Sequence, residues 1–447
     1  MPIELTAHTA AGVRLVLLAE ELSAQLAARA AEHDRDRTYP FEAIEALKAA
    51  GYFGAPVPVE LGGLGVSSAH DLVVASSRLA RGDASVAIGV NMHLVAVQNM
   101  ERRRQVAVAA GHERRARGFA ASLEQVAREG MVLAAAISER SQDLTRPGTS
   151  AQRTDSGWRI DGRKFFCTMS PGATHLYVSV RYSDGDGVER YAYAMVPTDA
   201  RGVTVHDDWD ALGMRASGSN SVSLDGVELP ESGVRGGFRA GDPTPYMERN
   251  LIAGLFHAAA SLGIAESADQ VARRDVAGRL AIPNFTTTNH HPQTNGASHV
   301  TSHLPTTDER AASAAAPPGV SDASDARTWM QVADNAIDLT AARGVLSRAA
   351  MLIDQHRGAN PTSDGTPEEL GALFAEAQAA KAFVSEASTR VVDRALALSG
   401  GAGYLNGSPL ARAYRDVKAG SFMHPLGANR AYDYLARVAL GGQPALH

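Results

Sequence analysis

The hydrophobic periodicity of the chain changes twice, and this change constrains the fold more than any other feature. From residue 1 to about 125, apolar residues recur at helical spacing, as in VRLVLLAEELSAQLAARAAEH. Between 126 and 238 they alternate in short runs such as HLYVSVRY and RYAYAMVP, which turn sequences like SDGDG separate. Helical spacing returns from 239 to 447. The order predicts an α+β multidomain protein, with an N-terminal helical domain, a middle antiparallel β-barrel and a C-terminal helical bundle over these three ranges.

Composition and charge exclude several classes of protein. A chain of 447 residues is too long for one hydrophobic core, which agrees with several domains. The formal net charge of −6 argues against a nucleic-acid partner, because phosphate binding needs concentrated positive charge. The single cysteine, Cys167, excludes an intramolecular disulfide. Since no apolar run reaches the roughly 18 residues of a membrane span, we expect a cytoplasmic protein.

A polar segment interrupts the second helical region. Residues 283–325 are rich in Thr, Asn, Ser, Ala and Pro and contain few large apolar side chains, so we expect a flexible insertion. The segment contains His290, His291, His299 and His303. The last two have a spacing that a helix could use to bind a metal, but no helical pattern and no cluster of carboxylates or thiolates accompanies them. We therefore predict a polar surface loop and no metal site.

Seven short sequences occur in a fixed order along the chain. They are FGAPVPVELGGLG (53–65), DASVAIGVNMHL (83–94), AAAISERSQDLTRPGT (134–149), WRIDGRKFFCTMSPGATH (158–175), WDALGMRASGSNSVSLDGVELP (209–230), ERNLIAGLFHAAASLGIA (248–265) and, over 399–420, SGGAGY followed by ARAYRDVKAG. Together they resemble the acyl-CoA dehydrogenase superfamily, over nearly the whole chain outside the insertion. In that superfamily FAD lies between the middle β domain and the C-terminal bundle, so the resemblance implies a flavoprotein oxidoreductase.

The resemblance also assigns residues to the cofactor. Ser138 takes the place of a residue that offers backbone groups to the pyrimidine edge of the flavin, and Thr168 matches the residue that hydrogen-bonds near flavin N5. Arg274 matches an arginine that reaches the FAD pyrophosphate of a neighbouring subunit. Gly400 and Gly401 match a turn in which backbone approaches the diphosphate closely. Because this cofactor site spans subunits, the resemblance implies a homo-oligomer, a dimer or a tetramer.

The catalytic glutamate that most members of the superfamily carry near the C-terminus is absent, because its position holds His424. Dehydrogenation of an acyl thioester needs a carboxylate base at the α-carbon. In a minority of members the base stands at the start of the first bundle helix, where this chain has Glu248. The favoured prediction is therefore α,β-dehydrogenation of an acyl thioester, bound to CoA or a carrier protein, with Glu248 as base, His424 as a cavity residue and a separate electron acceptor.

The alternative is a two-component flavin-dependent monooxygenase. Such members of the superfamily lack the glutamate, take reduced FMN or FAD from a partner reductase and use oxygen to hydroxylate a small molecule. They commonly have histidine near this turn, and a second histidine on the N-terminal helical domain faces the same cavity. His424 and His93 match these positions, and histidine exchanges protons near neutral pH. A relative that has lost its chemistry is a third reading, which the retained cofactor residues disfavour.

Overall fold

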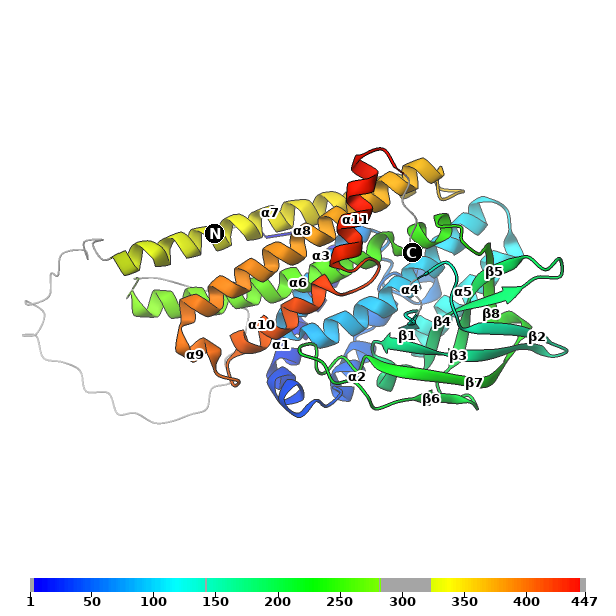
Figure 1. Cartoon of the computed structure of the whole chain (residues 1–447), viewed down its shortest axis with the longest axis horizontal. Coiled ribbons are helices and arrows are strands. Elements are labelled where there is room, and N and C mark those ends of the chain that lie inside the picture. The colour runs from blue at the N-terminus through cyan, green and yellow to red at the C-terminus, as the bar shows by residue number, and fades with distance from the viewer. Residues whose placement is uncertain (1–3, 141–142, 281, 283–322, 443–447) are drawn as a thin grey trace, which may run out of the picture.

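Helices, a β-sheet and again helices follow one another along the chain (Figure 1). The computed structural model describes residues 4–140, 143–280, 282 and 323–442. The predicted order of a helical region, a middle β region and a second helical region is confirmed. The predicted flexible insertion and its four histidines lie outside the described residues, except that a helix already begins at Ala323.

The N-terminal region contains five α-helices. Three of them begin at side-chain caps. Thr9 Oγ1 accepts from Gly12 N at the start of α1, Ser68 Oγ accepts from Asp71 N at the start of α3, and Asp83 Oδ1 accepts from Ser85 N at the start of α4. A carboxylate from the distant helix α7, Asp354, also accepts from Ala69 N and so ties α3 to the C-terminal bundle. The helices are α1 (Ala10–Asp36), α2 (Phe41–Ala49), α3 (Ala69–Gly82), α4 (Ala84–Ala109) and α5 (Glu113–Arg128).

The middle region forms one mixed sheet of eight strands, in the order β6-β7-β3-β2-β4-β5-β8 with β1 beside β4. The β1–β4 and β2–β4 pairs are parallel, and the path ends at β6 and β8. The predicted antiparallel barrel is therefore corrected to an open mixed sheet, because alternation along a strand does not reveal the direction of its neighbour. The strands are β1 (Leu133–Ala136), β2 (Ser150–Thr154), β3 (Gly157–Cys167), β4 (His175–Ser183), β5 (Glu189–Pro197), β6 (Val203–Val205), β7 (Asn220–Pro230) and β8 (Val234–Arg239).

The C-terminal region is a bundle of long helices with short ones at its ends. The α8 helix starts with a capping box, in which Thr366 and Glu369 satisfy each other's backbone N–H groups. The helices are α6 (Thr244–Arg279), α7 (Ala323–Ala359), α8 (Pro367–Ser399), α9 (Gly401–Tyr404), α10 (Pro409–Val417) and α11 (Ala428–Ala439).

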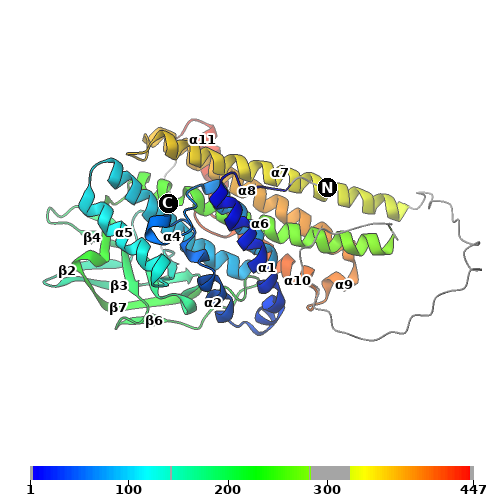
Figure 2. The same cartoon turned by 180° about the vertical axis from the view of Figure 1, so that it is seen from behind.

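The central helix of the molecule is α6. Among the described residues it is long and apolar enough to cross a membrane, but 94% of its apolar window is buried by the rest of the protein. It packs on α8, α7 and α3, and α4 lies between α6 and the sheet (Figure 2). A helix that is apolar on all sides is thus the core helix of this globular fold.

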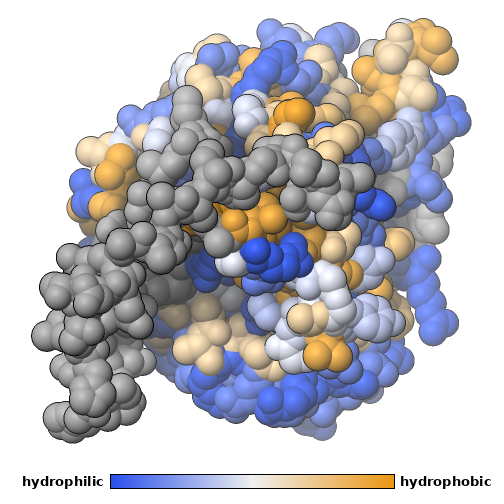
Figure 3. Space-filling model, turned by 90° about the vertical axis from the view of Figure 1, so that its left-hand side faces the viewer, coloured by the Kyte–Doolittle hydropathy of each residue, from blue (hydrophilic) through white to orange (hydrophobic). Residues whose placement is uncertain are grey.

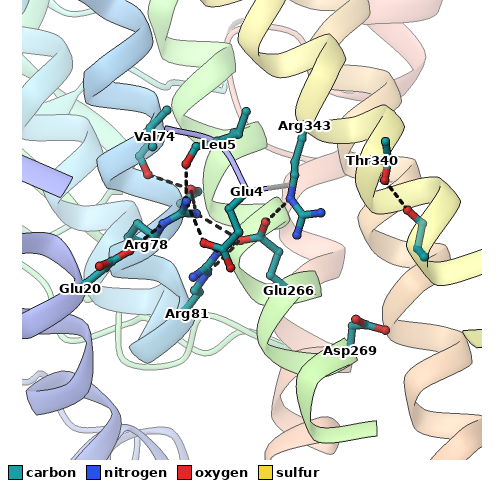
Figure 4. A network of polar contacts seen from close by, with 12 residues as sticks. Glu4, Leu5, Glu20, Val74, Arg78, Arg81, Glu266, Asp269, Thr340 and Arg343 are labelled. Atoms are coloured by element: carbon teal, nitrogen blue, oxygen red, sulfur yellow. Dashed lines mark hydrogen bonds and ion pairs between the residues drawn. The ribbon is translucent and has the colours of Figure 1, made fainter. Parts of the chain in front are cut away.

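A buried ionic network joins three of these helices near the middle of α6 (Figure 4). Glu266 of α6 pairs with Arg81 of α3 at 2.8 Å and with Arg343 of α7 at 2.8 Å. Arg78, also on α3 and 2% exposed, donates to Leu5 O at 2.5 Å. Burial would raise the pKa of Glu266, but the surrounding guanidinium groups lower it to about 2. The network therefore joins α3 of the N-terminal region to α6 and α7 of the C-terminal bundle.

Candidate active site

A cavity of about 680 Å³ lies where the sheet meets α4, α6 and the turn that precedes α11. This is the junction at which the sequence predicts the cofactor. Three predicted site residues line the cavity, namely Ser138, Thr168 and His424. The other predicted site residues lie elsewhere, namely Glu248, His93, Arg274, Gly400 and Gly401.

Thr168 stands directly after β3, where the backbone turns sharply. Phe166 and Met169 on either side of it have positive φ angles of 53° and 69°, a conformation that is costly for residues with side chains and is frequent at functional sites. Thr168 Oγ1 accepts from Ser219 Oγ at 2.9 Å and reaches Phe166 O only weakly, at 3.5 Å. A ligand atom in the cavity could replace that weak contact, so Thr168 can donate to a cofactor.

Ser138 and Glu139 follow β1 at the edge of the same cavity. The carbonyl of Ser138 accepts from Phe165 N at 2.9 Å, which fixes the segment against β3. The Glu139 carboxylate accepts from Lys164 Nζ at 2.5 Å and from Thr149 Oγ1 at 2.6 Å. Glu139 is the only carboxylate among the described residues that line the cavity. Because its oxygens already accept hydrogen bonds from Lys164 and Thr149, it stabilises the local structure and is not available as a base.

His424 lies in the turn between the 3₁₀ segment Lys418–Ser421 and α11. Its Nε2 atom is 2.8 Å from the hydroxyl of Tyr246 on α6. Burial, together with the positive charges of Lys381 and Arg430, lowers the pKa of His424 to about 3. The ring is therefore neutral at physiological pH, and a neutral imidazole can accept a proton from a ligand in the cavity.

A second histidine of the cavity, His257 on α6, is one that the sequence analysis did not identify. It is 4% exposed, and its Nδ1 atom has no hydrogen-bond partner among the described residues. Burial and, after it, the charge of Lys381 hold the pKa of His257 well below the ordinary value. The signal was present in the helical spacing, because Arg249, Ala253 and His257, each four residues apart, line the cavity from one face of α6.

Glu248 does not line the cavity, which corrects its prediction as the base. Its Oε2 atom is 2.7 Å from Arg103 Nη2 on α4, and Arg357 of α7 lies 3.9 Å from its Oε1. Asp364 pairs with the other nitrogen of Arg103 at 2.8 Å. Burial alone would raise the pKa of Glu248, but the positive charges of Arg103 and Arg357 outweigh it and hold that pKa below its ordinary value. Because its carboxylate faces these arginines and not the cavity, Glu248 cannot act as the base for a ligand there.

His93 does not line the cavity either, which corrects the expectation that it faces the same space as His424. Its Nδ1 atom accepts from Leu133 N at 3.0 Å, and its Nε2 atom lies 3.0 Å from Phe53 O. It is fully buried, and burial lowers its pKa to about 4. The ring joins α4 to β1 and to the segment that contains Phe53, so its position is that of a structural histidine.

The last turns of α6 and the short helix α9 lie at the end of the bundle far from the sheet (Figure 1). Arg274 belongs to those last turns, Gly401 is the first residue of α9, and Gly400 directly precedes it. Arg274 is exposed and stands 17 residues beyond His257 on α6, which corresponds to about 25 Å along the helix axis. Its neighbour Arg273 instead lies 2.7 Å from Asp269 on the same helix. A chain whose cavity holds the flavin cannot use Arg274 for that same flavin.

Positively charged side chains outnumber negative ones around the cavity. Arg249, Arg415, Lys418 and Arg430 line it, against the single carboxylate of Glu139. The Arg249 guanidinium stacks on the ring of Tyr193 with 3.4 Å between its Cζ and the ring centroid, and its Nε atom has no hydrogen-bond partner among the described residues. Arg415 is paired with Asp34, and Lys418 Nζ lies 3.8 Å from Asp393, so these two charges are partly balanced outside the cavity. The positive potential that would suit an anionic ligand therefore comes chiefly from Arg249.

Comparison with known proteins places the chain in a family. Models for the N-terminal, middle and C-terminal domains of acyl-CoA dehydrogenase match residues 17–102, 134–227 and 298–424. The chain is 32% identical to the amino sugar nitrososynthase DnmZ of Streptomyces peucetius, over 97% of this chain and 94% of that protein. It therefore belongs to the acyl-CoA dehydrogenase superfamily, and the predicted class, a flavoprotein oxidoreductase, is confirmed.

Solved structures resemble the whole chain as well. The nitrososynthase of Micromonospora carbonacea var. africana gives a TM-score of 0.78 at 29% identity and covers 98% of both chains. KijD3, solved with FMN and dTDP-3-amino-2,3,6-trideoxy-4-keto-3-methyl-D-glucose, gives a TM-score of 0.80 at 28% identity, over 98% of this chain and 96% of that one. These relatives are nitrososynthases or amino-sugar-binding proteins rather than acyl thioester dehydrogenases.

Proposed function

We propose that the protein is a flavin-dependent monooxygenase that oxidises the nitrogen of an amine. The observation that carries the proposal is the composition of the cavity. It has neutral His257 and His424 on its walls and no free carboxylate among its described lining residues. Without a carboxylate base, abstraction of an α-proton from a thioester lacks its catalyst, so the geometry favours this alternative over dehydrogenation with Glu248 as base.

The cavity residues fit a flavin. Thr168 has a hydroxyl available at the end of β3, Ser138 borders the same wall, and the volume and positive potential suit an isoalloxazine ring with an anionic tail. Reduced flavin supplies two electrons and, with oxygen, an electrophilic oxygen atom. An amine, oxygen and reduced flavin then give a hydroxylamine, water and oxidised flavin. The cofactor is FMN or FAD, as KijD3 was solved with FMN.

The histidines account for the protons of this reaction. An amine attacks an electrophilic oxygen through its nitrogen lone pair, so it must be neutral, and its nitrogen must lose a proton once the N–O bond forms. The substrate therefore enters as the neutral amine, and the neutral rings of His424 and His257 can accept a hydrogen bond from its nitrogen and take the proton that this nitrogen loses after the N–O bond forms. His424 is the better placed of the two, because its Nε2 atom is fixed by Tyr246 while the ring lines the cavity.

The substrate that fits best is an amino sugar linked to a nucleotide. DnmZ is named for amino sugars, and KijD3 was solved with a dTDP-linked amino sugar. The Arg249 guanidinium on the cavity wall, whose Nε atom has no hydrogen-bond partner among the described residues, suits a phosphate of such a carrier.

A second copy of the chain and a reductase complete the system. Arg274, Gly400 and Gly401 are too far from the cavity of their own chain, so we propose that they bind the flavin of a neighbouring subunit in a homo-oligomer, a dimer or a tetramer. Figure 3 shows hydrophobic residues among hydrophilic ones on this end of the molecule. Tyr404 in α9 and Leu405 directly after it are exposed. A separate cytoplasmic reductase would supply the reduced flavin.

Turnover with a reductase tests the proposal. The purified protein, a flavin reductase, NADH and oxygen are incubated with a panel of free and nucleotide-linked amino sugars, and products are identified by mass spectrometry. We expect hydroxylamine or nitroso products from at least one nucleotide-linked amine. Bleaching of bound flavin by an acyl-CoA without oxygen, with no amine oxidised, would instead support a dehydrogenase.

A further inference from the structure

The turn that carries His424 is held by a buried lysine on a different helix. Lys381 of α8 is 3% exposed, and its Nζ atom donates hydrogen bonds to Met423 O and, at 2.8 Å, to Leu426 O. These carbonyls belong to the residue directly before His424 and to the second residue after it. One amino group thus fixes the backbone on both sides of the ring, which only a side chain with several N–H donors can do.

Tyr246 of α6 fixes the ring of His424 itself. Its hydroxyl lies 2.8 Å from His424 Nε2 and 3.4 Å from Pro425 O. Neither Lys381 nor Tyr246 is among the described residues that line the cavity. Both therefore act on a cavity ligand only through the turn and the histidine.

The charge of Lys381 also acts on both cavity histidines. After burial, it is the largest cause that lowers the pKa of His424 and of His257. The other charged or titratable groups around the turn are Tyr246 on α6 and Arg430 on α11. Burial lowers the pKa of Lys381 itself to about 7, but a neutral amine keeps two N–H groups and can still bond both carbonyls.

We propose that Lys381 is a positioning residue for amine oxidation: it holds the Met423–Leu426 turn so that a neutral His424 ring borders the substrate. The inference rests on the proposed function. It gives α8 a role in the site although none of its described residues lines the cavity. Loss of this lysine should loosen the turn, admit water and let His424 be protonated, while the contacts that bind the substrate remain.

The first test is an NMR titration of the histidine rings in the protein without flavin, with the His424 signal assigned by its absence in His424→Gln. In the wild type the signal should not titrate above about pH 5. In Lys381→Gln its midpoint should move upward toward the ordinary value near 6.5, because the charge of Lys381 is lost and water enters the loosened turn. Lys381→Arg keeps a charged donor and should behave as the wild type. Lys48→Met, at an exposed ion pair with Glu45, is the matched lysine control.

The second readout is the oxygen consumed per amine oxidised. We expect this ratio to rise about tenfold in Lys381→Gln, because the variant loses about one hydrogen bond from a charged donor to the turn. The KM for the amine should stay within about twofold of the wild type, because no residue that contacts the amine has changed. A folded Lys381→Gln protein with wild-type titration and wild-type ratio would overturn the inference. Lys381→Met, which fills the same space with an apolar chain, replaces it if the glutamine variant does not fold. A wild type that oxidises no amine counts against the proposed function, while the titration still decides the role of Lys381.

Discussion

Two buried polar regions beside α6 differ in how their charges are balanced. One is the ionic cluster of Arg103, Glu248, Arg357 and Asp364, where carboxylates and guanidinium groups lie 2.7 to 3.9 Å apart. The other is the wall of the cavity with His257 and His424, where desolvation keeps both rings neutral and one nitrogen lacks a partner.

The comparison shows which groups of α6 are available for chemistry. A carboxylate fixed between two arginines is already neutralised and cannot take a proton from a ligand outside its cluster. A neutral imidazole that borders a cavity retains a free lone pair. The first region therefore holds helices together, and the second supports the proposed oxidation.

The largest expected effect concerns the ionic cluster. Arg103→Met should destabilise the protein by about 3–5 kcal/mol, because it leaves the buried Glu248 carboxylate without its closest partner. Urea denaturation measures the change. The double variant Arg103→Met, Glu248→Met should recover most of the stability, and a loss below about 1 kcal/mol in the single variant would contradict this assignment.

The next effect separates His93 from the cavity histidines through pH. Burial lowers the pKa of His93 to about 4 from 6.5. Between these values the unfolded chain binds a proton that the folded chain does not, so stability rises with pH and is lost as pH falls below 6.5. His93 should contribute about 3 kcal/mol to this loss by pH 4.

Urea denaturation at pH 7 and pH 4.5, for the wild type and for His93→Gln, isolates the contribution of His93. The variant should show a smaller loss on acidification, and per folded molecule its amine oxidation should match that of the wild type. If His93→Gln left the pH dependence of the free energy of unfolding unchanged and abolished amine oxidation, His93 would instead be an active-site residue.

His424→Ala should lower amine oxidation per folded molecule by about 100-fold, the usual contribution of one acid–base group. Product formation with the reductase measures this, and the exposed His112→Ala serves as the histidine control. A rate within about threefold of the wild type would mean that His257 or the amine itself handles the proton.

The smallest expected effect concerns the far end of the bundle. Arg274→Ala should weaken flavin binding by about 1.5 kcal/mol, roughly tenfold, through loss of a charged contact with the flavin of a neighbouring subunit. Arg273→Ala is the matched control, because Arg273 is paired with Asp269 within its own helix. Flavin titration measures both affinities. Equal effects of the two substitutions would show that Arg274 makes no specific contact with the flavin.

The sequence predicted the fold and the position of the cavity, because periodicity and seven local sequences depend on neighbouring residues. Thr168, Ser138 and His424 belong to such local sequences, and all three line the cavity. The predictions that Glu248 and His93 face the cavity were wrong. Glu248 pairs with Arg103 and His93 accepts from Leu133 N, and these partners lie on other elements, so no local sequence pattern indicates them. The sequence-based predictions missed His257, although Arg249, Ala253 and His257 follow one another at intervals of four residues in the sequence.

The most direct test of the central claim is the origin of the new oxygen atom. The wild type, a flavin reductase and a nucleotide-linked amino sugar are incubated under oxygen gas labelled with a heavy isotope, and the product is analysed by mass spectrometry. The account predicts one labelled oxygen on the nitrogen of each hydroxylamine. An unlabelled product, or oxidation of an acyl thioester that proceeds without oxygen, would contradict it.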